Sequence, residues 1–62
     1  MDQFLQAVQH AMVKRGWGPF SARAEIQFDP DHLMELQNEG ITAEDVAVEV
    51  IRQANVRQLA LQ

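Results

Sequence analysis

The absence of cysteine from a chain of 62 residues is the feature that most limits what this sequence can fold into. Disulfides, thiolate zinc sites and iron–sulfur clusters all need cysteine, so none of them can support the fold. One small core seldom provides more than about 3–5 kcal/mol of stability, and chains this short usually add a metal, a covalent link or a partner subunit. We therefore expect a single small domain over residues 1–62 that forms a homodimer.

The same small core argues against an enzyme. A substrate pocket of about 300 Å³ or more would hollow out much of it. The sequence shows no Ser-His-Asp order, no Gly-rich phosphate loop and no paired-carboxylate site. His10 and His32 have no acidic or histidine partners at metal-ligand spacing. We expect a binding protein with no cofactor, no metal and no small-molecule substrate.

The sequence also favours a protein that has no membrane partner. No apolar run approaches the roughly 20 residues that span a bilayer. The first residues, Met1-Asp2-Gln3, differ from the basic start of a signal peptide. We expect a cytoplasmic protein.

Charge is distributed unevenly along the chain. The formal net charge is −4, and residues 25–51 carry eight carboxylates with no Lys or Arg. This acidic segment is either a solvated face or a surface that binds a basic partner, for example by imitating DNA phosphates. The residues expected on such a partner surface are Glu35, Glu39, Glu44, Asp45 and Trp17.

Residues 2–15 are predicted to form a helix. Apolar side chains recur there at three- and four-residue spacing, Asp2 can cap the first turn, and Gly16 is a natural terminator. Lys14 and Arg15 lie in the last turn, where cations suit the helix dipole.

A short helix is predicted after Asp29. This residue can cap it, Pro30 suits the first helical position, and Gly40 ends it. Ile41 is then expected to fold back on Leu36, as in a glycine-terminated C-cap.

The last helix is predicted to start at the cap Thr42 and to run toward Leu59. Val46, Val48 and Val50 also alternate with period two, so a strand over 46–51 is the alternative.

Residues 23–28 alternate with period two, which predicts a half-buried strand. A lone strand leaves backbone groups unpaired, and the same strand of a second chain is the simplest partner. The residues expected at this dimer interface are Ala24, Ile26, Phe28, Val46, Val50 and Ile51.

This order of elements, over about residues 23–58, resembles the ribbon-helix-helix superfamily of bacterial DNA-binding repressors and antitoxins. The resemblance rests on the alternation over 23–28, on Asp29-Pro30-Asp31-His32-Leu33 and on Gly40-Ile41-Thr42. It implies a mainly α fold with one short β-strand, arranged helix-strand-helix-helix, that dimerises through an intermolecular antiparallel β-ribbon.

The resemblance also implies a small DNA-binding regulator whose ribbon reads the major groove. By position, the base readers would be Arg23, Glu25 and Gln27. Backbone amides around Thr42 and Ala43 would clamp a phosphate, and the N-terminal helix could add Lys14 and Arg15 as phosphate contacts.

Trp17 and Phe20 flank a Gly-Pro turn, where they either close the core or, if exposed, anchor a partner. Two functions therefore remain open from the sequence. One is a dimeric DNA-binding regulator or antitoxin-like protein, and the other is an acidic adaptor or inhibitor that binds a partner protein.

Overall fold

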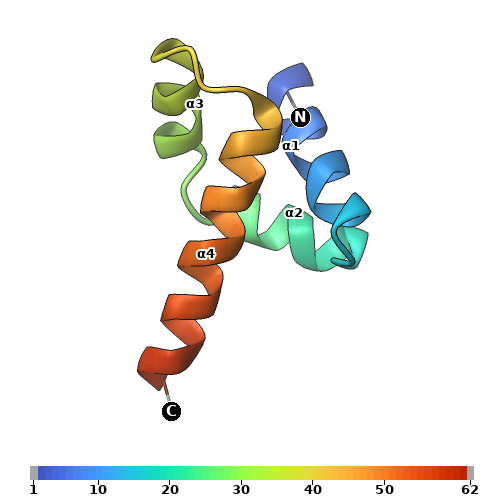
Figure 1. Cartoon of the computed structure of the whole chain (residues 1–62), viewed down its shortest axis with the longest axis vertical. Helices are drawn as coiled ribbons and strands as arrows, with labels where there is room; N and C mark the ends of the chain where they lie inside the picture. The colour runs from blue at the N-terminus through green and yellow to red at the C-terminus, as the bar shows by residue number, and fades with distance from the viewer. Residues whose placement is uncertain (1, 62) are drawn as a thin grey trace.

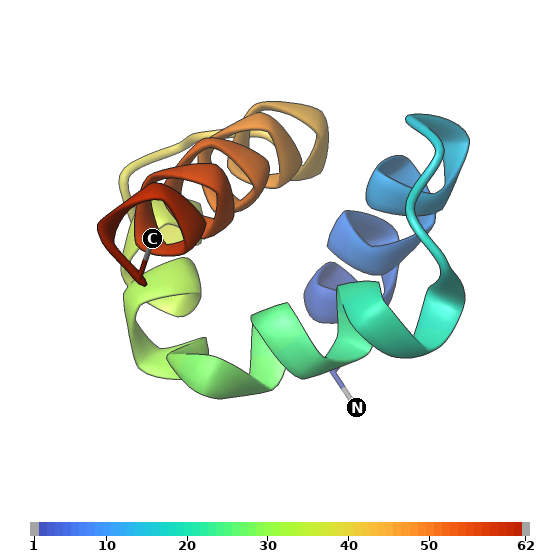
Figure 2. The same cartoon turned by 90° about the horizontal axis from the view of Figure 1, so that it is seen from below.

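The computed structural model describes residues 2–61 as four helices. They are α1 (Gln3–Lys14), α2 (Pro19–Phe28), α3 (Pro30–Asn38) and α4 (Ala43–Leu61). Met1 and Gln62, the ends of the expected 1–62 domain, lie outside the described residues. The long helix α4 lies between α1 and α3, and its last turns extend beyond the other helices (Figure 1). Figure 2 shows α2 running across one side of the molecule, from α1 to α3.

All four helices contribute to one core. The largest fully buried side chains are Met12 and Val8 of α1, Ile26 of α2 and Val46 of α4, and α3 adds Leu33. Among the pairs of helices, α1 and α4 share the most extensive contact. Within residues 2–61, no helix combines the length and the hydropathy that a membrane span requires.

The helix predicted over 2–15 is confirmed as α1. The Asp2 carboxylate accepts a hydrogen bond from the Phe4 backbone amide at 2.8 Å. Gly16 has a φ of 97°, the left-handed conformation that ends a helix without steric strain when the residue has no Cβ.

The predicted start and end of the helix after Asp29 are confirmed by α3. The Asp29 side chain accepts from the His32 amide at 3.3 Å. At the other end Gly40 has a φ of 87°, and the Ile41 amide donates to the Leu36 carbonyl at 3.1 Å. This bond returns the chain over the last turn of α3 and directs it into α4.

The cap predicted at Thr42 is also confirmed, because the Asp45 amide donates to Thr42 Oγ1 at 3.2 Å. The alternative strand over 46–51 is wrong, since these residues are helical. Val46 and Val50 are buried and Val48 is exposed, as expected for one helix with an inner and an outer face.

The strand predicted over 23–28 is wrong, because this segment forms most of α2. Six residues are too few to separate a period of two from a period of 3.6. The buried pair of α2 is Ala22 and Ile26, which lie four residues apart. Pro19 occupies the first helical position, where its missing N–H costs nothing, so this Pro starts a helix instead of prolonging a turn.

The predicted helix-strand-helix-helix fold with its intermolecular β-ribbon is therefore wrong, although the mainly α part is confirmed. The described chain contains no strand that could pair with a second copy. Ile26, Val46 and Val50, expected at the dimer interface, fill the core of a single chain. Ile51 is partly buried against this core, whereas Ala24 and Phe28 are exposed.

Candidate protein-binding groove

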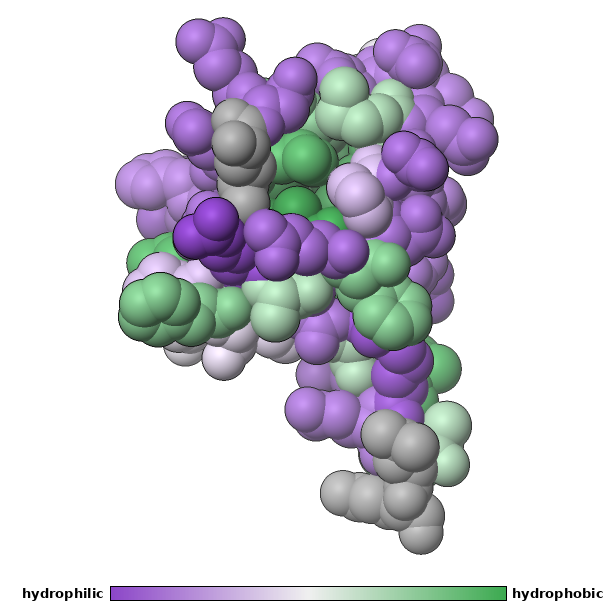
Figure 3. Space-filling model, turned by 180° about the vertical axis from the view of Figure 1, so that it is seen from behind, coloured by the Kyte–Doolittle hydropathy of each residue, from purple (hydrophilic) through white to green (hydrophobic). Residues whose placement is uncertain are grey.

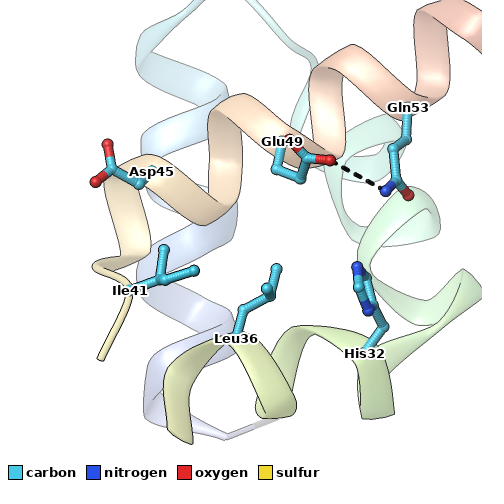
Figure 4. Close-up of a pocket in the computed structure, with 6 residues that line it drawn as sticks. All are labelled: His32, Leu36, Ile41, Asp45, Glu49 and Gln53. Atoms are coloured by element: carbon cyan, nitrogen blue, oxygen red, sulfur yellow. Dashed lines mark hydrogen bonds between the residues drawn. The ribbon is translucent and has the colours of Figure 1, made fainter. Parts of the chain in front are cut away.

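A groove of ≈ 450 Å³ lies between α3 and α4. Figure 4 shows Leu36 and His32 of α3 pointing toward α4 and Gln53 of α4 pointing back toward His32, while Ile41 of the α3–α4 connection lies at one end. The residues that line this groove are His32, Leu36, Ile41, Asp45, Glu49 and Gln53.

The floor of the groove is apolar because of the turn at Gly40. The backbone bond from Ile41 to Leu36 holds these two side chains side by side at the end of α3. Both are partly buried against the core, so each keeps some apolar surface available in the groove. A ligand with an apolar side chain could cover that surface.

The rim of the groove is acidic. Glu35 of α3 and Glu39, its C-terminal cap, follow His32 by three and seven residues, so they lie beside the helix face that carries His32 and Leu36, although neither lines the groove itself. Asp45 stands on the α4 side. We call Glu35, Glu39 and Asp45 the rim carboxylates. All three are exposed, and none forms an ion pair within the described chain.

Glu49 is the one groove carboxylate that has partners. Arg52 donates to both of its oxygens, and Gln53 Nε2 donates to Glu49 Oε1 at 3.2 Å. The Arg52 guanidinium lowers the pKa of Glu49; Gln53 and the nearby His32 act in the same direction, against the opposing effect of partial burial. Glu49 therefore carries a full negative charge at neutral pH, and this charge is partly balanced.

On the side of α4 that faces α1, the carboxylate of Glu44 forms ion pairs with Lys14 and Arg15. Lys14 Nζ lies 2.9 Å from Glu44 Oε1, and Arg15 donates to Glu44 Oε2 at 3.0 Å. The hydrogen bond from Lys14 is the main cause of a lowered pKa at Glu44, with Arg15 adding to it and partial burial opposing it. Glu44, expected on the partner surface, thus belongs to the contact between α1 and α4.

The residues expected to contact DNA lie in two places, on α2 and where the end of α1 meets the start of α4. Arg23 and Gln27 are exposed on α2, but Glu25 is half-buried and pairs with Arg57 of α4. Lys14 and Arg15 form ion pairs with Glu44. Thr42 uses its side chain to cap α4, and the Ala43 side chain packs against the core.

Trp17 was expected either to close the core or to anchor a partner; it is partly buried and packs against the core, as the first alternative predicts, and it lines no part of the groove. Of the six groove residues, the sequence predicted only Asp45 as a ligand contact; the five that it missed are His32, Leu36, Ile41, Glu49 and Gln53. The four-residue spacing of Asp45, Glu49 and Gln53 could have indicated a common helix face. Nothing in the sequence indicated that α3 would lie opposite that face.

The described residues contain no group of three or more His, Asp or Glu side chains that could hold a metal ion. The groove is thus characterised by an apolar floor and an acidic rim. The resemblance to the ribbon-helix-helix superfamily stays a prediction from the sequence, while the fold that it implies is contradicted. In comparisons with protein-family models, curated proteins and solved structures, the chain matches none of them.

Proposed function

We propose that this protein is an interaction module that binds a basic, amphipathic helical segment of a partner protein in the α3–α4 groove. The observation that carries this proposal is an apolar floor, Leu36 and Ile41, with the exposed rim carboxylates next to it: Asp45 lines the groove, and Glu35 and Glu39 lie on α3 and at its C-terminal cap. The fold uses none of these three carboxylates in an ion pair between described residues. Their charge is available to a ligand.

The groove favours a helix-borne ligand. Apolar side chains that recur every three or four residues would cover the floor, in the mode by which amphipathic helices bind grooves. A volume of ≈ 450 Å³ accommodates a few side chains, so only one face of such a helix would enter. Lys or Arg on the flanks of that face would meet the rim carboxylates and steer association.

DNA binding is less well supported. Of the five Lys and Arg residues in the chain, Lys14, Arg15, Arg52 and Arg57 form ion pairs with carboxylates of the same chain, and Arg23 forms none with any residue that the structure describes. A DNA-binding protein needs free cations to displace the counterions of the phosphates. The acidic rim would also repel phosphates, so a partner protein is the better candidate.

Two synthetic helical peptides can test the proposal. They share the same apolar positions, but one has Lys on both flanks and the other has Glu. Titrated into ¹⁵N-labelled protein, the Lys peptide should shift the amide resonances of His32, Leu36, Ile41 and Glu49, and raising the salt concentration should weaken its binding. Equal binding of both peptides, or shifts confined to other helices, would contradict the proposal.

Charge reversal at two exposed rim positions separates the protein-binding and DNA-binding functions. The double variant Glu35→Lys, Glu39→Lys should leave stability nearly unchanged, slow association of the Lys peptide markedly and tighten binding to random duplex DNA. The control variant Gln27→Lys adds a cation on α2, outside the groove, and it should leave peptide binding nearly unchanged. Unaltered peptide binding by the double variant would show that the rim takes no part.

A further inference from the structure

The outer face of α2 exposes two phenylalanines. Phe20 is 84% exposed and Phe28 is 70% exposed, and the exposed Ala24 lies midway between them in the sequence. The face of the molecule in Figure 3 shows a band of hydrophobic colour at the level of α2, framed by hydrophilic residues. We call Phe20, Ala24 and Phe28 the α2 stripe. Exposed aromatic patches of this kind are typical of interaction surfaces.

The stripe is a regular feature of the helix. Its members are four residues apart, so they lie within an arc of about 80° on the side away from the buried Ala22 and Ile26. The guanidinium of Arg57 lies over the Phe28 ring, 4.2 Å from its centroid, which helps to orient this ring. The core therefore takes one face of α2 and leaves an apolar row on the other.

We propose that a second copy of this chain covers the α2 stripe, with the two α2 helices packed antiparallel and crossing at Ala24. A twofold interface requires that the same surface be complementary to itself. Phe20 and Phe28 are equally far from Ala24, so an antiparallel crossing at Ala24 places Phe20 of each chain near Phe28 of the other. Rows of side chains four residues apart are the ridges that interlock in the commonest class of helix packing, and the small Ala24 allows a close approach.

The area of the stripe indicates a weak dimer. A phenylalanine offers about 200 Å², so at the observed exposures the four rings of two chains would bury roughly 600 Å². Specific interfaces bury about 1,200 Å² or more in total. The rings would supply about half of that minimum, and the flanking Arg23 and Gln27 would have to contribute to the rest. The dimer should accordingly form at micromolar or higher concentrations.

This interface is independent of the groove between α3 and α4. It uses Ala24 and Phe28, which the sequence had suggested for a β-ribbon, but it brings them together on helices. Ile26 takes no part, since it is fully buried in the core of its own chain. Failure of the groove to bind peptides would leave this inference standing, and the converse also holds.

Sedimentation equilibrium over a range of concentrations tests the inference. The wild type should show a reversible monomer–dimer equilibrium, and Phe20→Ala should weaken dimerisation at least tenfold while the circular dichroism spectrum stays the same. Leu59→Ala on α4 is the matched control, because this side chain is 71% exposed but lies outside the stripe. A wild type that stays monomeric at several hundred micromolar, or a dimer that Leu59→Ala disrupts and Phe20→Ala does not, would overturn the inference.

A single introduced cysteine gives a second and more local test. The chain has no cysteine, so the variant Ala24→Cys can form only one kind of disulfide, between two copies. If Ala24 lies at the twofold crossing, the two sulfurs come within bonding reach, and mild oxidation should yield a covalent dimer quickly. Val48→Cys, at an exposed position on α4, should crosslink much more slowly. Equal rates for the two variants would show that the contact is random collision.

Discussion

Glu44 and Asp45 are neighbours in the first turn of α4, but the structure gives their charges opposite roles. Glu44 turns toward α1 and pairs with Lys14 and Arg15. Asp45 lines the groove between α3 and α4 and forms no ion pair in the described chain. Within one turn of helix, the fold thus pairs one carboxylate and leaves its neighbour without an ion pair between described residues.

The two sides of α4 differ in packing as well as in charge. On the α1 side, Met12 and Val46 are fully buried, and the ion pairs of Glu44 lie at the edge of this contact. On the α3 side, Leu36 and Ile41 are only partly buried and form the floor of an open groove. The difference indicates that the α1–α4 contact stabilises the fold, whereas the α3–α4 groove retains apolar and charged surface for a ligand.

The largest expected effect is a loss of stability that tests the difference in packing between the two sides of α4. Met12→Ala should destabilise the protein by about 2–5 kcal/mol, because it leaves a cavity in the core between α1 and α4. Leu36→Ala removes a partly exposed side chain and should cost clearly less. Urea unfolding of both variants provides the comparison. If Leu36→Ala cost as much as Met12→Ala, the groove floor would be as tightly packed as the core, and the distinction would fail.

A smaller effect is expected at the turn that forms the groove. Gly40 has a φ of 87°, and a Cβ at this position would meet no heavy atom within 4 Å, so a substitution acts through the backbone alone. Gly40→Ala should cost roughly 1–2 kcal/mol, because alanine is strained in the left-handed conformation. Gly40→Asn should cost less, since asparagine tolerates this conformation. Equal losses in thermal unfolding would argue against a backbone cause.

The smallest expected effect on stability is that of removing the Glu44 charge, and this effect depends on pH. The pKa of Glu44 is lowered in the folded protein, chiefly by its hydrogen bond from Lys14. A lowered pKa means that the carboxylate stabilises the fold above its unfolded-state pKa, and that this stabilisation is lost as the pH falls through the folded-state pKa. Glu44→Gln should therefore reduce stability at neutral pH and make little difference in strong acid. Lys14→Gln combined with Arg15→Gln should remove most of the Glu44→Gln effect, a coupling that a double-mutant cycle measures.

Helix ends were the most predictable part of this fold, because their signals are local. Asp2, Asp29 and Thr42 each accept a hydrogen bond from a backbone amide two or three residues ahead, as their positions predicted. The glycines at 16 and 40 adopt the positive φ that a helix terminator needs. Such signals depend only on residues within one turn of one another.

The segment 19–28 could not be assigned in the same way. Ala24, Ile26 and Phe28 recur at every second residue, as they would on one face of a strand, but the tertiary structure buries Ile26 with Ala22 and exposes the other two. Which residues of a short segment are buried is decided by the helices around it. That information is non-local, and for this reason the β-ribbon and the dimer interface built on it were wrong.

The groove could be predicted only in part. The acidic character of residues 25–51 is plain in the sequence, and Glu35, Glu39 and Asp45 were among the expected surface residues. Glu44 forms ion pairs, whereas these three carboxylates form none between described residues. This difference depends on α1 lying along one side of α4 and α3 along the other. Pairing across 29 or more residues, as between Arg15 and Glu44, leaves no mark in the local pattern.

The most direct test of the difference between the two sides of α4 is the affinity of the Lys-flanked peptide for two adjacent single variants. Asp45→Asn and Glu44→Gln each remove one negative charge from the same helical turn, so a net-charge effect would be equal in both. We expect Asp45→Asn to weaken binding severalfold at low ionic strength, with Glu44→Gln close to the wild type, in isothermal titration calorimetry. Equal weakening by the two variants, or a larger loss for Glu44→Gln, would contradict the account that the α3–α4 groove is the binding site.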